Sequence, residues 1–313
     1  MYQNLKVFSG NSNKGLAKEI CRYLNIPLSK LHISRFSNDN LFVQVKENVR
    51  EKDVFVIQSF SRPVSNHIME LLITLDALRS ASAKRITAVI PYFSYARSDK
   101  KDAPRISIAG RLMADLLKTA GANRVLTMDL HADSVHGFFS IPVDHLTAIP
   151  IICEHFKKRL DIPNTVVVAT DAGGAKRVGR FARKMNTSMA IIDKRRISDT
   201  DVVQGLVVGD VKRKDAIIFD DEISTGTTIL TSVETLEKAG VRKVYVGTTH
   251  PVLSGPAVKN LQDLRVEEIV ATNTVEVSPK KKMDHLKILP VGPLLAEAIK
   301  RIHSGESVGA LFT

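Results

Sequence analysis

The chain has 313 residues, 44% of them hydrophobic, a length that allows one large or two medium domains. It has no apolar run long enough to cross a membrane and no signal-peptide core in its first residues, so we expect a soluble cytoplasmic protein. The two cysteines, Cys21 and Cys153, lie too far apart in the sequence to form a metal or redox motif.

The formal net charge is +12, from 45 basic and 33 acidic side chains. Nucleic-acid binding is one interpretation, but the basic residues form no tail and do not alternate with aromatic residues. A basic cleft for nucleoside triphosphates and sugar phosphates explains the charge equally well. We expect small anionic substrates, no nucleic-acid partner and no membrane partner, and keep a nucleic-acid-binding module as an alternative.

Apolar runs alternate with helical patterns from end to end of the chain. The predicted strands are 6–9, 53–58, 85–91, 125–128, 165–170, 189–193, 216–220, 243–248 and 268–272. The predicted helices are 13–24, 67–81, 106–120, 150–159, 173–185, 228–239 and 291–302. This alternation predicts an α/β fold with a mostly parallel sheet flanked by helices.

The same order of strand, loop, helix and strand occurs in both halves of the chain. Residues 53–91 contain the first copy and residues 215–248 the second, and only the second has paired aspartates after its first strand. We therefore expect two similar domains, residues 1–148 and 149–313, with the phosphosugar loop in the second. The last helix and tail are expected to pack back on the first domain.

Two strand ends in the first half carry candidate binding residues. After strand 85–91, Arg97 could clamp a phosphate and Lys101 could add a point charge, although a solvent-exposed charged loop is an equally good interpretation. After strand 125–128, Asp129 and His131 could share a metal ion. An isolated Asp-x-His motif, however, more often has a structural role than a metal-binding one.

Two further strand ends lie in the second half. Asp171 precedes two glycines and suits a metal ion or a hydroxyl, or else caps a helix. Lys194 and Arg196 belong to a polar basic segment that could close over a triphosphate, or else remain a solvated loop. Because the carboxyl ends of parallel strands share one edge of a sheet, we expect these loops to meet in one active site.

The segment 216–228 is the most informative one. An apolar run ends in Asp220 and Asp221, and a hydroxyl-rich loop with Gly226 leads into a helical pattern. Free N–H groups at a helix start bind phosphate, and glycine allows close approach of the backbone. Carboxylates would repel that phosphate, so the aspartates suit sugar hydroxyls, a metal ion or both. The order of these features indicates a phosphorylated-sugar site, whereas either feature alone would suggest only an acidic turn and an N-cap.

At this point the chain resembles the ribose-phosphate pyrophosphokinase family, also called phosphoribosyl pyrophosphate synthetases, over nearly its whole length. The matching motifs include Val-Phe-Ser-Gly-Asn-Ser at 7–12, Met-Asp-Leu-His-Ala at 128–132, Asp-Ala-Gly-Gly-Ala-Lys-Arg at 171–177 and Leu-Ala-Glu-Ala-Ile at 295–299. The resemblance implies two tandem type I phosphoribosyltransferase-like domains. It also implies a homo-oligomer, a hexamer or another dimer-based assembly, in which a neighbouring subunit completes the ATP site.

The resemblance further implies a reaction that serves nucleotide biosynthesis. The 1-hydroxyl of ribose 5-phosphate attacks the β-phosphorus of ATP, and the products are 5-phosphoribosyl 1-pyrophosphate and AMP, with Mg²⁺ as the cofactor. A phosphoribosyltransferase that uses this product, or a catalytically silent regulatory homologue, is the alternative. Release of AMP without any nucleobase would discriminate between the first two.

Residue roles follow from the resemblance by position. Lys194 and Arg196 match the catalytic flexible loop, and His131 and Asp171 match the magnesium positions. The positions that match ATP-binding ones are Phe36, Asn38, Asp39, Asn40, Arg97, Ser98 and Lys101. The positions that match ribose 5-phosphate-binding ones are Asp220, Asp221, Ser224, Thr225, Gly226, Thr227 and Thr228.

The chain departs from the family pattern at several positions. Asn40 stands where glutamate is usual, Ser98 where glutamine is common, Ser224 where aspartate is common and Thr227 where glycine is common. The positions that match the family's regulatory ones read Asp133, Ser134, His136, Asp144, His145 and the segment 307–312, and two of them, Asp133 and Gly309, replace a hydroxyl-bearing residue. Because Asp133 is negative and Gly309 lacks a hydroxyl, we expect weak activation by phosphate and blunted allosteric inhibition by ADP.

Overall fold

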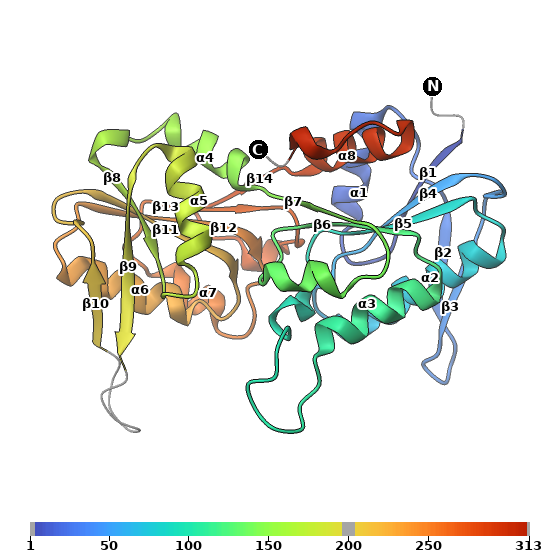
Figure 1. Ribbon diagram of the computed structural model, residues 1–313, viewed down its shortest axis with the longest axis horizontal. Coiled ribbons are helices and arrows are strands. Elements are labelled where there is room, and N and C mark those ends of the chain that lie inside the picture. Colours follow the sequence, from blue (N-terminus) through green and yellow to red (C-terminus); the bar gives the residue numbers. More distant parts are fainter. Residues whose placement is uncertain (1–3, 196–203, 312–313) are drawn as a thin grey trace. The chain divides into compact units, whose positions relative to one another are not determined.

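The computed structural model describes residues 4–195 and 204–311 (Figure 1). It divides into two compact units. The first unit comprises Met1–Thr147, Thr274–Glu276 and Pro290–Thr313, and the second comprises Ala148–Asn273 and Val277–Leu289. The C-terminal segment, residues 290–313, therefore belongs to the first unit. The chain passes from the first unit into the second after residue 147 and returns to the first after residue 289. Among the described residues, no helix is long and apolar enough to span a membrane.

The first unit is built on a parallel five-stranded sheet. Its strands, in spatial order, are β1 (Leu5–Ser9), β4 (Asp53–Ile57), β5 (Arg85–Ile90), β6 (Arg124–Met128) and β7 (Val143–Leu146). The helices α1 (Lys14–Leu24) and α8 (Gly292–Ser304) pack together on one face, and α2 (Val64–Ser80) and α3 (Ala109–Ala120) pack together on the other (Figure 1). A separate antiparallel hairpin consists of β2 (Leu31–Arg35) and β3 (Leu41–Val45).

The second unit has a seven-stranded sheet in the order β10-β9-β8-β11-β12-β13-β14, in which only β10 is antiparallel to its neighbour. These strands are β8 (Thr165–Ala169), β9 (Ser188–Arg195), β10 (Gln204–Val208), β11 (Asp215–Ile223), β12 (Lys243–Pro251), β13 (Glu268–Thr272) and β14 (Leu286–Leu289). Helix α4 (Ile149–Lys157) packs with α5 (Ala175–Met185), and α6 (Thr227–Lys238) packs with α7 (Ala257–Gln262).

Side chains of β11 show why this sheet is covered on both faces. Ile218 belongs to the core cluster that contains Ile229 of α6, whereas the ring of the next residue, Phe219, stacks on Phe181 of α5 with 4.2 Å between centroids. Consecutive strand residues point to opposite faces, so both faces need an apolar cover. The apolar run of β11 thus follows from its position between two helical layers.

The α/β fold class is confirmed, and every predicted strand and helix is present within three residues of its expected bounds. The short strands β2, β3, β7, β10 and β14 were not predicted. β2 and β3 are only partly buried along their length. The strands form two separate sheets, as expected for two similar domains, so the strand-end loops are divided between the edges of two sheets.

Candidate active site

The loop between β11 and α6 forms an open cradle. Gly226 has a φ of 76°, and α6 begins at the next residue without a side-chain cap on its first turn among the described contacts. The side chains of Thr225, Thr227 and Thr228 are exposed beside these N–H groups. A helix start that leaves its N–H groups to solvent and surrounds them with hydroxyls is suited to bind a phosphate.

Two contacts from elsewhere in the second unit hold this cradle. The Ser254 N–H donates to the Ser224 carbonyl at 2.8 Å, and the Asn260 side-chain amide donates to the Thr225 carbonyl at 2.9 Å. A Cβ at Gly226 would lie 3.1 Å from Leu261 Cγ, so α7 packs closely under the turn. Glycine is required here both by its left-handed backbone and by this close approach.

The acidic pair lies just before the cradle and meets an arginine from α5. Arg177 Nη1 is 2.9 Å from Asp220 Oδ1 and 2.6 Å from Asp221 Oδ1. The Thr170 hydroxyl donates to Asp220 Oδ2 at 3.2 Å, and the Asp221 N–H donates to Asp220 Oδ1 at 2.9 Å. The side chain of Asp220 is 21% exposed and that of Asp221 only 2%. Asp220 is therefore the carboxylate that a ligand can reach directly.

Burial raises the pKa of Asp220 above its ordinary value, and the neighbouring carboxylate of Asp221 raises this pKa further. The guanidinium of Arg177 acts in the opposite direction and lowers the same pKa. Two carboxylates share one arginine, so the cluster retains negative charge that a cation or hydroxyl donors can neutralise.

The other predicted residues of the second unit are at the carboxyl ends of β8 and β9. Asp171 is exposed, and its Oδ1 accepts the Gly174 N–H at 2.8 Å. Lys194 lies on β9, where its backbone is in register with Gly205 of β10. The side chain of Lys194 and the whole of Arg196 lie outside the described residues.

The predicted ATP-binding residues lie in the first unit. Phe36 is 58% exposed beside the turn of the β2–β3 hairpin, and Asn38, Asp39 and Asn40 form that turn, in which the Phe36 N–H donates to the Asn40 carbonyl at 2.9 Å. Arg97 is exposed at the end of a 3-10 helix that follows β5. Ser98 has a structural use, since its hydroxyl accepts the Ala109 N–H at 3.1 Å at the start of α3.

Lys101 and His131 are also exposed in the first unit, and His131 follows β6. The predicted residues therefore divide between the carboxyl ends of two sheets and one hairpin. Within the second unit, the structure brings together Asp220, Asp221 and the hydroxyl loop on one strand–turn–helix segment.

Comparison with known proteins gives the family. Residues 5–121 match the model of the N-terminal domain of ribose phosphate pyrophosphokinase, and residues 203–313 match that of the phosphoribosyl synthetase-associated domain. The ribose-phosphate pyrophosphokinase of Deinococcus radiodurans is 52% identical over 99% of this chain and 98% of the relative, and that of Bacillus subtilis is 45% identical over the same shares. The chain belongs to the ribose-phosphate pyrophosphokinase family.

The structure agrees with that family. The crystal structure of phosphoribosylpyrophosphate synthetase from Mycobacterium smegmatis matches with a TM-score of 0.92 and 38% identity, and the match covers 97% of this chain and 100% of that one. The resemblance inferred from the motifs is thereby confirmed, and so is the enzyme class, a transferase of the pyrophosphokinase type.

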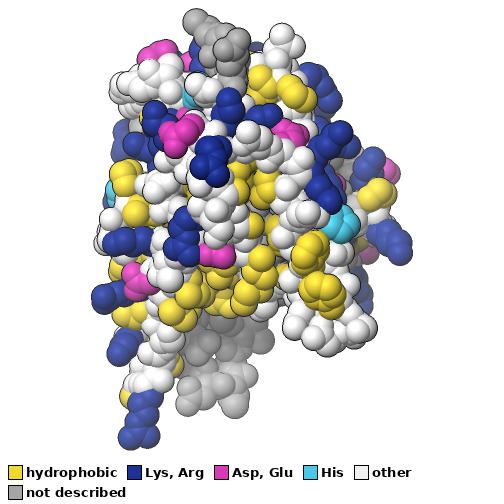
Figure 2. Space-filling view, turned by 90° about the vertical axis from the view of Figure 1, so that its right-hand side faces the viewer, with side chains coloured by type: hydrophobic (Ala, Val, Ile, Leu, Met, Phe, Trp, Pro, Cys, Tyr) yellow, Lys and Arg dark blue, Asp and Glu magenta, His cyan; other side chains and the backbone are white. Residues whose placement is uncertain are grey.

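The positive charge of this family member does not gather on the face shown in Figure 2. Lys and Arg side chains are scattered there among acidic, apolar and other side chains. Since a continuous basic stripe is the usual footprint of nucleic-acid binding, this face offers no support for that alternative.

Three residues of the site were not predicted. Thr170 and Arg177 hold Asp220, and Asn260 holds the cradle. Arg177 is the last residue of the motif at 171–177, but its hydrogen bond with Asp220 joins residues 43 positions apart. Its place on the first half of α5, after the strand that neighbours β11, is the signal that could have found it.

Proposed function

We propose that this protein transfers the β,γ-pyrophosphoryl group of ATP to the 1-hydroxyl of ribose 5-phosphate, giving 5-phosphoribosyl 1-pyrophosphate and AMP. The observation that carries the proposal is the open cradle at the start of α6 directly after a carboxylate pair. The cradle suits the 5-phosphate, and an exposed carboxylate just upstream suits the ribose hydroxyls.

In this proposal, the hydroxyls and N–H groups of residues 224–228 hold the 5-phosphate, and Asp220 accepts hydrogen bonds from the ribose. Asp221 contributes to the same subsite through its contact with Arg177. Binding the sugar in one orientation brings its 1-hydroxyl to the β-phosphorus and avoids the entropic cost of a bimolecular encounter. Lys194 and Arg196 stabilise the charge that develops on the transferring group.

The nucleotide is proposed to bind to Phe36, Asn38, Asp39, Asn40, Arg97, Ser98 and Lys101. The exposed ring of Phe36 offers a face for the adenine, and Arg97 and Lys101 offer charges for the phosphates. A homo-oligomer, as the family resemblance implies, is proposed for this chain as well, with a neighbouring copy completing the ATP site.

Mg²⁺ is the proposed cofactor, and the donors present fit it. Asp171 and Asp220 offer carboxylate oxygens, which this ion prefers, and Asp171 keeps Oδ2 outside its contact with Gly174. Residues 4–195 and 204–311 contain no cluster of three or more metal-binding side chains, so triphosphate oxygens and water would supply most of the ligands. His131 is proposed as a further magnesium residue because its position matches the family motif. When bound, Mg²⁺ neutralises charge on the triphosphate.

The test is AMP formation from ATP and Mg²⁺, with and without ribose 5-phosphate, and with no nucleobase. We expect AMP only when ribose 5-phosphate is present. AMP formation at the same rate with and without ribose 5-phosphate would contradict the proposal. Activity that requires a nucleobase would also contradict it and would favour the phosphoribosyltransferase alternative.

A further inference from the structure

Arg177 contacts both carboxylates of the acidic pair through one nitrogen atom. Its Nη1 lies 2.9 Å from Asp220 Oδ1 and 2.6 Å from Asp221 Oδ1. The side chain of Arg177 is 15% exposed, and it comes from α5, whereas the carboxylates come from β11. One guanidinium therefore fixes the separation of the two carboxylates from outside their own strand.

The two carboxylates are not equivalent in this arrangement. Asp221 is almost fully buried, at 2% exposure, and its Oδ1 faces Arg177. Asp220 is ten times more exposed, and its two oxygens also accept from the Thr170 hydroxyl and the Asp221 N–H. Donors from three different segments thus hold Asp220 in one rotamer with part of its carboxylate open to solvent.

We infer that Arg177, anchored by buried Asp221, is the positioning residue that presents Asp220 to the hydroxyls of the sugar phosphate. This inference rests on the proposed function of the β11–α6 loop and assigns Arg177 no contact with the substrate. The Arg177–Asp220 contact is a charge-assisted hydrogen bond, which is short and strong, whereas the contact with Asp221 is an ion pair. Loss of Arg177 should therefore release Asp220 from its orientation. Removing the arginine would also leave two adjacent carboxylates in mutual repulsion.

The experiment compares Arg177→Gln, Arg177→Lys and the control Arg183→Gln in steady-state AMP formation. Arg183 is an exposed arginine of the same helix. For Arg177→Gln we expect the KM for ribose 5-phosphate to rise roughly 10- to 100-fold, the effect of losing one hydrogen bond to a charged group, with a much smaller change in the KM for ATP. Arg177→Lys keeps the charge and should recover part of the loss, and Arg183→Gln should match the wild type.

Asp221→Asn and the double variant with Arg177→Gln complete the test. If Asp221 acts by anchoring Arg177, the effects of the two single substitutions on the KM for ribose 5-phosphate will not multiply in the double variant. Thermal unfolding of each variant separates a folding defect from a binding defect, and Arg177→Lys serves if Arg177→Gln does not fold.

An unchanged KM for ribose 5-phosphate in folded Arg177→Gln, or equal changes in both KM values, would overturn the inference. Multiplicative effects of Arg177→Gln and Asp221→Asn would overturn the anchoring by Asp221. The wild-type assay separates these failures from failure of the proposed function, since in the latter case the wild type itself makes no AMP from ATP and ribose 5-phosphate. Calorimetric titration with ribose 5-phosphate then still reports whether Arg177 affects binding of the sugar phosphate.

Discussion

The first strands of the two repeated segments, β4 and β11, end in opposite ways. After β11 the chain opens into the cradle, where Thr225, Thr227 and Thr228 are exposed. After β4 the chain enters the core, where Gln58 and Ser59 have no exposed surface. The same strand–loop–helix frame is therefore an exposed loop in one unit and packed interior in the other.

A buried carboxylate makes this difference. Glu70 of α2, 4% exposed, accepts from the Asn11 N–H at 2.6 Å, from the Asn11 side-chain amide at 2.7 Å and from Gln58 Nε2 at 2.8 Å. The first unit thus supplies its own anion for donors at the end of the sheet, whereas the second unit leaves the donors of α6 for a ligand. Whether such a frame can bind depends on whether its polar groups are already satisfied.

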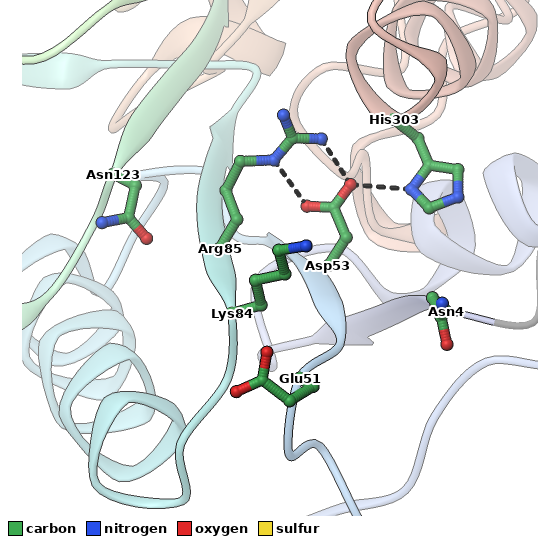
Figure 3. A pocket seen from close by; sticks show the side chains of 7 residues that line it. All are labelled: Asn4, Glu51, Asp53, Lys84, Arg85, Asn123 and His303. Carbon is green, nitrogen blue, oxygen red and sulfur yellow. Dashed lines mark hydrogen bonds and ion pairs between the residues drawn. The ribbon is translucent and has the colours of Figure 1, made fainter.

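The amino ends of the sheets show a parallel contrast. Asp53 and Arg85 form a two-point ion pair at the start of β4 and β5, and His303 and the Ile302 carbonyl of α8 add contacts to it beside a pocket of about 540 Å³ (Figure 3). Asp215 and Arg242 form the corresponding pair in the second unit, where Arg242 is 49% exposed. The first pair has additional contacts from α8, whereas Arg242 of the second pair is more exposed than Arg85, at 49% against 35%.

The largest expected effect tests whether the second unit carries the chemistry. We expect Lys194→Ala to lower kcat by roughly 100-fold or more with a smaller change in the KM for ATP, because a cation that engages the transferring group acts mainly in the transition state. Steady-state kinetics measures it. An unchanged kcat would remove Lys194 from the mechanism.

A pair of glycine substitutions should distinguish the role of the β11–α6 loop from that of the loop after β4, against which Gly10 packs. Gly226→Ala places a side chain at a φ of 76°, a strain of about 1–2 kcal/mol, and should raise the KM for ribose 5-phosphate roughly tenfold as the cradle shifts. Gly10→Ala places a Cβ 2.3 Å from Gln58 Oε1 and should lower the unfolding temperature with an unchanged KM in the folded protein. The comparison fails if Gly10→Ala alters the KM for ribose 5-phosphate.

Glu70→Gln tests the internal anion of the first unit. In place of one carboxylate oxygen, the NH2 group of the glutamine would face hydrogen-bond donors and could not accept from them. We expect the free energy of unfolding to fall by about 1–3 kcal/mol. Chemical denaturation of this variant and of the exposed control Glu51→Gln gives the difference. Equal stability of both variants would show that the hydrogen bonds of Glu70 do not stabilise the loop after β4.

The ion pairs Asp53–Arg85 and Asp215–Arg242, at the amino ends of the two sheets, should contribute differently to stability. We expect Asp53→Asn to reduce the free energy of unfolding by about 1–3 kcal/mol, because Arg85 and His303 both lose an ionised acceptor. Asp215→Asn should cost less, since water reaches Arg242 when that pair is broken. Thermal unfolding of both variants measures the difference. A larger loss of stability in Asp215→Asn than in Asp53→Asn would contradict this prediction.

The smallest expected effect concerns phosphate. The Ser134 hydroxyl donates to Asp99 Oδ2 at 2.7 Å, and Asp144 pairs with Arg124 at 2.6 Å, so these two predicted regulatory residues already have protein partners. Phe312 lies outside the described residues. We expect the initial rate at pH 8 to vary little with phosphate concentration at fixed Mg²⁺ and ionic strength. A steep dependence would place the enzyme in the ordinary phosphate-activated class.

Local signals in the sequence were enough for the longer strands and helices and for the β11–α6 loop. Each of these is encoded within a short window, as in the run from Ala216 to Thr228. The contacts that distinguish the two units are long-range. Glu70 reaches Asn11 across 59 positions, and His303 reaches Asp53 across 250. Periodicity and turn chemistry report neighbours along the chain, so they could not predict these contacts.

The return of α8 to the first unit has a consequence for biosynthesis. Gly292 at the start of α8 packs so closely on α1 that a Cβ there would lie 2.5 Å from Glu19 Cδ. A growing chain that has reached residue 289 contains all of β1, α1 and β4 but not the helix that covers α1. The first unit to leave the ribosome is thus the last to be completed, and until then its partly bare α1 surface is open to chaperones or to pairing with another nascent chain.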